Sequence, residues 1–253
     1  MSRGHWAALT AWTVIASVGC GGDEPAADSE LTVSAASSLT GAFEAYGEET
    51  PDVEERFEFA GSDDLAAQIR QGAAPDVYAA ANTDLPEALA EEGLVGEPTV
   101  FATNALVIGV PAGSDIDSID DLAQPGTDLI IGTQDVPFGS YARTVLSRLP
   151  PAQEEAILGN VRSEESDVKA AVGKLAQGAA DASFVYTSDV DASGGEIEAV
   201  ELAPDLQPDV AYGVAVAEEA ENPEEAQEFI DGLESGAGAE ALEAAGFKPP
   251  PKA

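Results

Sequence analysis

Histidine and cysteine are nearly absent from this 253-residue chain, which has one of each, His5 and Cys20. A single cysteine excludes a framework of disulfide bonds within the chain. Because the only histidine lies in the first six residues, the rest of the chain cannot form a Ser-His-Asp triad, which needs a histidine base beside the serine. No Gly-x-Ser-x-Gly or phosphate-loop motif occurs either. The sequence therefore argues against a serine hydrolase.

Basic residues are scarce as well. Ten Lys and Arg stand against 48 Asp and Glu, and the formal net charge is -38. Such a chain has no basic stripe with which to contact nucleic-acid phosphates, so nucleic-acid binding is excluded. The acidic residues are spread along the sequence, and exposed charges more than about 8 Å from a site are largely screened at physiological salt. The negative charge therefore indicates a solvated surface and does not exclude an anionic ligand.

The N-terminal apolar stretch is too short to span a bilayer and has the layout of a secretory signal. Residues 1–6 carry an arginine and the histidine, residues 7–18 are mostly apolar, and Cys20 precedes an acidic segment at 21–30. This layout resembles a bacterial lipoprotein signal, in which the cysteine is lipidated and becomes the new N-terminus. The resemblance implies a signal peptide at 1–20, a lipid anchor on Cys20, an acidic linker at 21–30 and attachment to the outer face of the cell membrane. An ordinary signal peptide with an incidental cysteine, and a free periplasmic protein, is the alternative.

The chain after this linker alternates strands and helices, with a serine at two of the junctions. Residues 31–37 predict a strand that runs into a helix, with Ser38 at the N-cap position that serine favours. The pattern repeats with a strand at 56–60, after which Ser62 occupies the equivalent place. A third strand and a further helix follow within 76–92. Strands separated by helices predict right-handed crossovers and a parallel sheet, whose ligands bind beyond the carboxyl ends of the strands.

Two segments are predicted to cross between lobes. The strand at 104–111 leads into the first crossing, and the proline-containing segment 203–208 forms the return. We therefore predict an α/β clam-shell of two lobes, each a mostly parallel sheet flanked by helices, which closes on a ligand by hinge motion. The predicted boundaries are 31–111 and 206–249 for lobe 1, 112–205 for lobe 2 and 250–253 for a tail.

Further hydrogen-bond donors are predicted at the ends of elements in lobe 2. One helix begins near Phe138, another opens near Val168, and a strand at 182–186 ends in the Tyr186 hydroxyl. Helix N-termini offer unpaired N–H groups and the positive end of the macrodipole, which suit anions. Considered singly, each junction serine is explained by capping and the tyrosine by a half-buried strand. Their joint occurrence indicates a ligand site.

Six stretches, in order along the chain, resemble the molybdate-binding proteins of ABC transporters, which have the type II periplasmic binding-protein fold. These stretches are 33–40, 59–62, 74–78, 135–142, 166–168 and 185–189. The resemblance implies a monomeric extracytoplasmic binding protein, not an enzyme, that captures molybdate or tungstate and delivers it to an ABC permease. It implies no cofactor, with molybdenum held as its oxyanion and not as a cation. The implied ligands are the hydroxyls of Ser38, Ser62 and Tyr186 and the backbone of Phe138 and Val168.

The chemistry of a tetrahedral dianion agrees with such a site. Its oxygens only accept hydrogen bonds, so neutral hydroxyl and amide donors can bind it without a basic residue. Phosphate near neutral pH carries a proton that needs an acceptor, and leaving a buried group unpaired costs about 1–3 kcal/mol. Sulfate or thiosulfate is an alternative ligand. A cation such as iron or calcium, bound by carboxylates with Tyr186 or Tyr212, is another, although the acids show no ligand-loop spacing.

Two departures from the resembling family concern the site. Asp63 and Asp64 follow Ser62, and a carboxylate close to a dianion would repel it. We expect both side chains to face solvent and complement the helix dipole, with ligation of the metal centre as the alternative. Phe138 stands where a small residue is usual, so the change affects the size of the pocket more than the number of donors.

Overall fold

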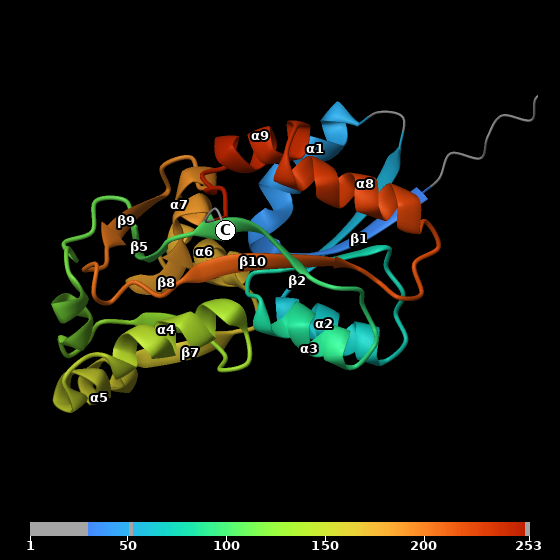
Figure 1. Ribbon diagram of the computed structural model, residues 1–253. Helices are drawn as coiled ribbons and strands as arrows, with labels where there is room; N and C mark the ends of the chain where they lie inside the picture. The colour runs from blue at the N-terminus through green and yellow to red at the C-terminus, as the bar shows by residue number, and fades with distance from the viewer. Residues whose placement is uncertain (1–29, 51–52, 251–253) are drawn as a thin grey trace, which may run out of the picture.

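The computed structural model describes residues 30–50 and 53–250, which form two β-sheets of five strands each. The first sheet consists of β1 (Glu30–Ala36), β2 (Glu54–Ala60), β3 (Val77–Ala80), β4 (Thr99–Asn104) and β10 (Val210–Val216). The helices that flank this sheet are η1 (Ser37–Leu39), α1 (Thr40–Glu49), α2 (Ser62–Arg70), α3 (Asp84–Glu91), α8 (Pro223–Glu234) and α9 (Ala237–Ala244). Figure 1 shows α1, α8 and α9 on one face of this sheet and α2 and α3 on the other. We call this part lobe 1.

The second sheet and its helices form lobe 2. Its strands are β5 (Leu106–Pro111), β6 (Leu129–Gly132), β7 (Val161–Glu165), β8 (Ala182–Tyr186) and β9 (Ile197–Glu201). Its helices are η2 (Ile119–Ala123), α4 (Pro137–Ser147), α5 (Pro151–Gly159), α6 (Val168–Ala176) and α7 (Thr187–Ala192). The two lobes lie side by side in Figure 1.

Both sheets have the same topology. Their strand orders are β2-β1-β3-β10-β4 and β7-β6-β8-β5-β9. In lobe 1, β1 is parallel to β2 and β3, whereas β10 is antiparallel to β3 and β4. In lobe 2, β6 is parallel to β7 and β8, and β5 is antiparallel to β8 and β9. Each sheet is therefore mostly parallel with one reversed strand, which confirms the predicted fold class.

The chain crosses from lobe 1 to lobe 2 at Ala105. β4 ends at Asn104 in the first sheet and β5 begins at Leu106 in the second. The first crossing therefore lies before the strand at 106–111 and not after it, which corrects the sequence-based boundary of lobe 1. The sequence gives no sign of the change of sheet, because β4 is followed by β5 with only Ala105 between them. The return occurs between β9 and β10, within 202–209.

The central strands of both lobes are buried in the hydrophobic core, which fixes the positions of their carboxyl ends. All residues of β3, β6 and β8 are buried, as expected for strands covered on both faces. One hydrophobic cluster extends through both lobes, and a smaller one around Leu65, Tyr78 and Leu89 lies beneath α2 and α3. The rings of Tyr186 and Tyr212 pack edge to face across the lobes, with centroids 5.9 Å apart.

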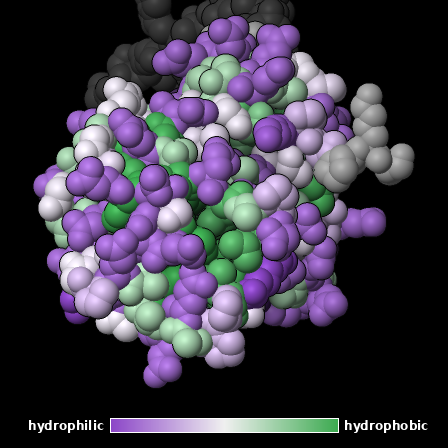
Figure 2. Space-filling model, turned by 90° about the vertical axis from the view of Figure 1, so that its left-hand side faces the viewer, coloured by the Kyte–Doolittle hydropathy of each residue, from purple (hydrophilic) through white to green (hydrophobic). Residues whose placement is uncertain are grey.

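The surface at the lobe 2 end is mainly hydrophilic. Figure 2, viewed from the lobe 2 end, shows hydrophilic side chains over most of the face with smaller hydrophobic areas between them. Within 30–50 and 53–250, no helix combines the length and apolar character needed to cross a membrane. The predicted signal peptide with Cys20, and the predicted linker apart from Glu30, lie outside the described residues.

Candidate functional site

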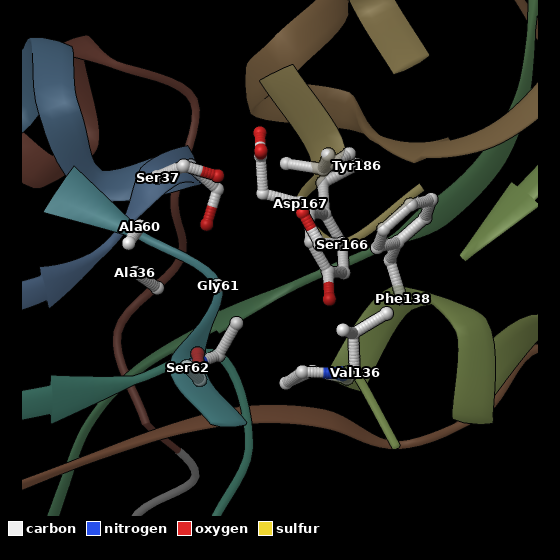
Figure 3. Close-up of a pocket in the computed structure, with 14 residues that line it drawn as sticks. Ala36, Ser37, Ala60, Gly61, Ser62, Val136, Phe138, Ser166, Asp167 and Tyr186 are labelled. Carbon is white, nitrogen blue, oxygen red and sulfur yellow. The ribbon is translucent and has the colours of Figure 1, made fainter. Parts of the chain in front are cut away.

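A small cavity lies between the lobes, at the carboxyl ends of parallel strands from both sheets. Its volume is about 20 Å³, little more than the roughly 10–15 Å³ that one buried water requires. Figure 3 shows residues of lobe 1, among them Ser37 and Ser62, facing Phe138 and Tyr186 of lobe 2 across this space. The lining residues are Ala36, Ser37, Ser38, Ala60, Gly61, Ser62 and Ala81 from lobe 1 and Val136, Pro137, Phe138, Ser166, Asp167, Val168 and Tyr186 from lobe 2. Only a very small ligand fits.

The structure brings together the five residues assigned by the resemblance. Ser38 and Ser62 line the cavity from lobe 1, and Phe138, Val168 and Tyr186 line it from lobe 2. They come from five different strand-to-helix junctions, so each sheet gathers its own residues at one edge, and the packing of the two lobes brings the two groups together. None of the lining residues is basic.

Ser38 is not the N-cap that the sequence predicts. A 3₁₀ turn over Ser37–Leu39 separates β1 from α1, and Leu39 occupies the cap position of α1. The Ser38 hydroxyl instead lies 3.0 Å from the hydroxyl of Tyr212. No backbone group of α1 uses the Ser38 oxygen as a cap, and on geometry alone either hydroxyl can donate the bond between Ser38 and Tyr212.

Ser62 is the first residue of α2, and Gly61 holds the N-cap position predicted for the serine. The side-chain oxygen of Ser62 accepts a hydrogen bond from the Ala81 N–H at 3.1 Å. Its backbone carbonyl accepts another from the Tyr78 hydroxyl at 2.7 Å. Ser62 is therefore fixed from two sides while its hydroxyl proton stays free to donate.

Backbone donors of lobe 2 come from the starts of α4 and α6. Pro137 opens α4 and has no N–H, so Phe138 supplies the first amide of that helix. Val168 supplies the first amide of α6, whose N-cap Asp167 accepts from the Ala170 N–H at 2.9 Å. First-turn amides have no partner within their helix. Two amide donors at positive helix ends thus adjoin the cavity.

Tyr186 has the most unusual environment of the lining residues. It is 1% exposed, and its hydroxyl has no hydrogen-bond partner among the described residues. Burial raises the pKa of Tyr186 well above its ordinary value, which keeps the hydroxyl protonated. Its backbone N–H donates to the Asp189 carboxylate at 3.0 Å, which fixes the start of α7. A protonated, buried and unpartnered hydroxyl on a cavity is a donor without an acceptor.

The two aspartates after Ser62 do not line the cavity. Both lie in the first turn of α2, where a carboxylate complements the helix dipole. Asp64 is exposed, as expected. Asp63 is only partly exposed, and one of its oxygens is buried without a partner. Burial, with a smaller effect from Asp64, raises the pKa of Asp63. The expectation that both side chains face solvent is therefore met by Asp64 and not fully by Asp63.

Some residues at the site have no counterpart in the sequence-based assignment. Ser37 and Ser166 line the cavity beside predicted residues, and their places in the same turns could have suggested them. The sequence suggests Tyr212 only as a ligand of the alternative cation. It lies 174 residues from Ser38, and no local pattern links the two.

The described residues contain no arrangement suited to a cation. Within 30–50 and 53–250, no group of three or more His, Cys, Asp or Glu side chains is placed to hold a metal ion. The rings of Tyr186 and Tyr212 are in contact, but the Tyr186 hydroxyl has no hydrogen-bond partner among the described residues and the Tyr212 hydroxyl pairs with that of Ser38. The geometry thus favours an acceptor-only ligand.

Comparison with known proteins gives the family. The family model described as bacterial extracellular solute-binding protein matches residues 31–248. The chain belongs to this family. The molybdate-binding protein ModA of Mycobacterium tuberculosis is 34% identical over 257 residues, with 96% of each chain covered. This solute-binding protein is extracytoplasmic and not an enzyme, and the resemblance seen in the sequence is confirmed.

Many solved structures are similar to this solute-binding protein, and two of them concern molybdate or molybdenum transport. The substrate binding domain of a putative molybdenum ABC transporter from Clostridium difficile is 28% identical, with a TM-score of 0.67, and covers 88% of this chain and 99% of its own. The Azotobacter vinelandii periplasmic molybdate-binding protein is 21% identical, with a TM-score of 0.77 and coverage of 87% and 100%. The second likeness shows the shared two-lobed fold.

Proposed function

We propose that this protein captures molybdate or tungstate outside the cytoplasm and delivers it to an ABC permease. The observation that carries the proposal is the buried, unpartnered Tyr186 hydroxyl on a cavity whose hydroxyl and amide donors are neutral and whose one carboxylate, Asp167, caps α6. An unsatisfied buried hydroxyl costs about 1–3 kcal/mol, and an oxyanion in the cavity would remove that cost. The molybdate-binding and molybdenum-transport names of the relatives support this ligand over other solutes.

We assign the ligand contacts to five residues. The hydroxyls of Ser38, Ser62 and Tyr186 and the N–H groups of Phe138 and Val168 would donate to the oxyanion. Each hydrogen bond to a charged acceptor contributes about 1.5–3 kcal/mol, so several neutral donors can replace a basic residue. Donors come from both lobes, so the ligand would hold the lobes together, as hinge closure requires.

The donor set also bears on which tetrahedral anion is bound. The carboxylate of Asp167, the acid that lines the cavity, already caps α6 through the Ala170 N–H. The side-chain oxygen of Ser62 already accepts from the Ala81 N–H. These bonds use part of the acceptor capacity at the cavity, so a protonated phosphate has to compete for what remains. Molybdate, tungstate and sulfate carry no proton that needs an acceptor. Sulfate or thiosulfate is the competing ligand of the same chemistry, and size separates it from molybdate.

Titration calorimetry of the mature protein with molybdate, tungstate, sulfate, phosphate and ferric citrate tests the proposal. We expect binding of molybdate and tungstate at one site per chain, much weaker binding of sulfate, and no heat from phosphate or ferric citrate. Tight ferric binding without heat from any oxyanion would overturn the proposal. If sulfate bound more tightly than molybdate, the proposed ligand would be wrong but the proposed site would stand.

We also propose that Cys20 is lipidated and tethers the protein to the outer face of the membrane. The support is the order of basic, apolar and small residues before Cys20 and the acidic segment after it. Mass spectrometry of the mature N-terminus, with and without the signal-peptidase inhibitor globomycin, measures the modification. An unmodified Cys20 would reject the anchor without affecting the binding proposal.

A further inference from the structure

The Tyr212 hydroxyl lies next to the proposed oxyanion site without lining the cavity. Tyr212 belongs to β10 and is fully buried, and its Oη is 3.0 Å from the Oγ of Ser38. On geometry alone either oxygen can donate this hydrogen bond. The pairing of β10 with β4 shifts by one residue directly after Tyr212, and such irregularities re-aim neighbouring side chains.

The ligand decides which of the two oxygens donates. Ser38 has a single hydroxyl proton, and an oxyanion can only accept hydrogen bonds. When Ser38 gives its proton to the ligand, its oxygen can pair with Tyr212 only as an acceptor. Burial, and to a lesser extent the negative charge of Asp189, raises the pKa of Tyr212 well above its ordinary value. The phenol therefore keeps the proton that it has to donate.

We propose that Tyr212 is a positioning residue for oxyanion binding, because its hydroxyl donates to Ser38 Oγ and commits the Ser38 proton to the ligand. The inference rests on the proposed function and adds to it a residue that does not touch the ligand. Consecutive hydrogen bonds in a low-dielectric interior polarise one another, so donation by Tyr212 strengthens Ser38 as a donor. Without the hydrogen bond from Tyr212, the Ser38 hydroxyl loses both its orientation and this polarisation.

The ring of Tyr212 has a packing role that can be separated from its hydroxyl. It contacts Phe101, Tyr186 and Phe247 edge to face, with centroid distances of 6.2, 5.9 and 5.2 Å. Tyr212→Phe keeps these contacts and removes only the hydroxyl. Tyr46→Phe is the matched control, because the buried Tyr46 hydroxyl donates to the Phe229 carbonyl at 3.4 Å and does not line the cavity.

A double-mutant cycle with Ser38→Ala, measured by calorimetry with molybdate, tests the inference. We expect Tyr212→Phe to weaken binding about five-fold, the change for one neutral hydrogen bond, and Tyr46→Phe to leave it unchanged. In the Ser38→Ala background, Tyr212→Phe should have almost no further effect, because the group through which it acts is gone. A merely structural role would give the same loss in both backgrounds.

The outcomes separate this inference from the proposed function. A wild-type protein that binds no oxyanion overturns both. A wild type that binds molybdate, with Tyr212→Phe binding equally well, overturns the inference alone. So does an equal loss in the wild-type and Ser38→Ala backgrounds. Thermal melts of the ligand-free variants accompany each titration, so that a loss of folded protein is not read as a loss of affinity.

Discussion

Gly61 and Ser166 lie so close across the cleft that a β-carbon on Gly61 would be 2.4 Å from the Ser166 carbonyl oxygen. Gly61 belongs to lobe 1 and Ser166 to lobe 2, and both line the cavity. The backbone of Gly61 has φ -60° and ψ 137°, which any residue can adopt. Glycine is therefore needed here for the approach of the lobes and not for its backbone freedom.

Gly61→Ala should weaken ligand binding while leaving the ligand-free protein folded. The added methyl group conflicts with lobe 2 only in the closed arrangement, and overpacking of this kind costs about 1–3 kcal/mol. Calorimetry with molybdate measures the loss, and a thermal melt without ligand checks the fold. Gly41→Ala is the control, since a β-carbon there has no atom within 4 Å. Equal affinities for Gly61→Ala and wild type would show that the lobes need not approach this closely.

Tyr186→Phe should change binding and stability in opposite directions. Removing the unpartnered hydroxyl relieves a buried unsatisfied group, so the ligand-free protein should become no less stable and up to about 1–3 kcal/mol more stable. Molybdate binding should weaken by about 1.5–3 kcal/mol, because a charged acceptor loses one donor. Ser38→Ala should weaken binding similarly. Unchanged affinity in both variants would remove the site assignment.

The sequence predicts which junctions meet at the cavity better than it predicts the local structure around them. Ser38 and Ser62 follow strands whose alternation with helices is visible in the sequence, so their convergence at the sheet edge could be inferred. Their predicted N-cap roles are wrong, because a 3₁₀ turn precedes α1 and Gly61 caps α2. Serine suits both a cap and the neighbouring positions, and sequence alone does not distinguish them.

Features that depend on contacts between distant segments could not be predicted. The hydrogen bond between Ser38 and Tyr212 joins residues that are far apart in sequence. The close approach of Gly61 to Ser166 depends on how two separately folded sheets meet. The change of sheet at Ala105 lies inside an unbroken strand pattern. In each case the deciding interaction is tertiary, and the local residue pattern is compatible with several outcomes.

Asp189 should make the protein more stable as the pH falls from about 7 toward 4. Burial raises the pKa of this carboxyl from 3.8 to about 7. Between these values the folded state holds a proton that the unfolded chain has lost, so the free energy of unfolding decreases as pH rises. Asp189→Asn should flatten this dependence, because the amide oxygen can still accept from the Tyr186 N–H and carries no charge.

The size of the Asp189 effect follows from the two pKa values. Each pKa unit corresponds to about 1.4 kcal/mol, so the dependence is on the order of 4 kcal/mol. Urea unfolding of wild type and Asp189→Asn at pH 4 and pH 8 measures most of it. The control is Asp191→Asn, which removes an exposed carboxylate from the same helix. Parallel pH profiles for wild type and Asp189→Asn would contradict the prediction.

Asp76 should have the opposite pH dependence, although it is just as buried, at 2% exposure. Burial alone would raise its pKa, but hydrogen bonds from Thr32 and Asn222 outweigh burial and hold the pKa below its usual value. The Thr32 N–H and hydroxyl donate to one oxygen, both at 2.8 Å, and the Asn222 N–H donates to the other at 2.7 Å. These contacts tie β1 to the segment before α8.

Asp76→Asn should therefore destabilise the protein at neutral pH and much less in acid. The asparagine amide has only one acceptor oxygen, so its NH₂ group would lie against an N–H or O–H group that now donates to the carboxylate. Losing a hydrogen bond to a charged group costs about 1.5–3 kcal/mol. The stability that ionised Asp76 supplies is complete above the unfolded pKa of 3.8 and is lost as the pH falls through the lower folded pKa. Urea unfolding at pH 7 and pH 3 tests this. A difference between wild type and Asp76→Asn that is the same at both pH values would mean that the loss comes from packing and not from the charge.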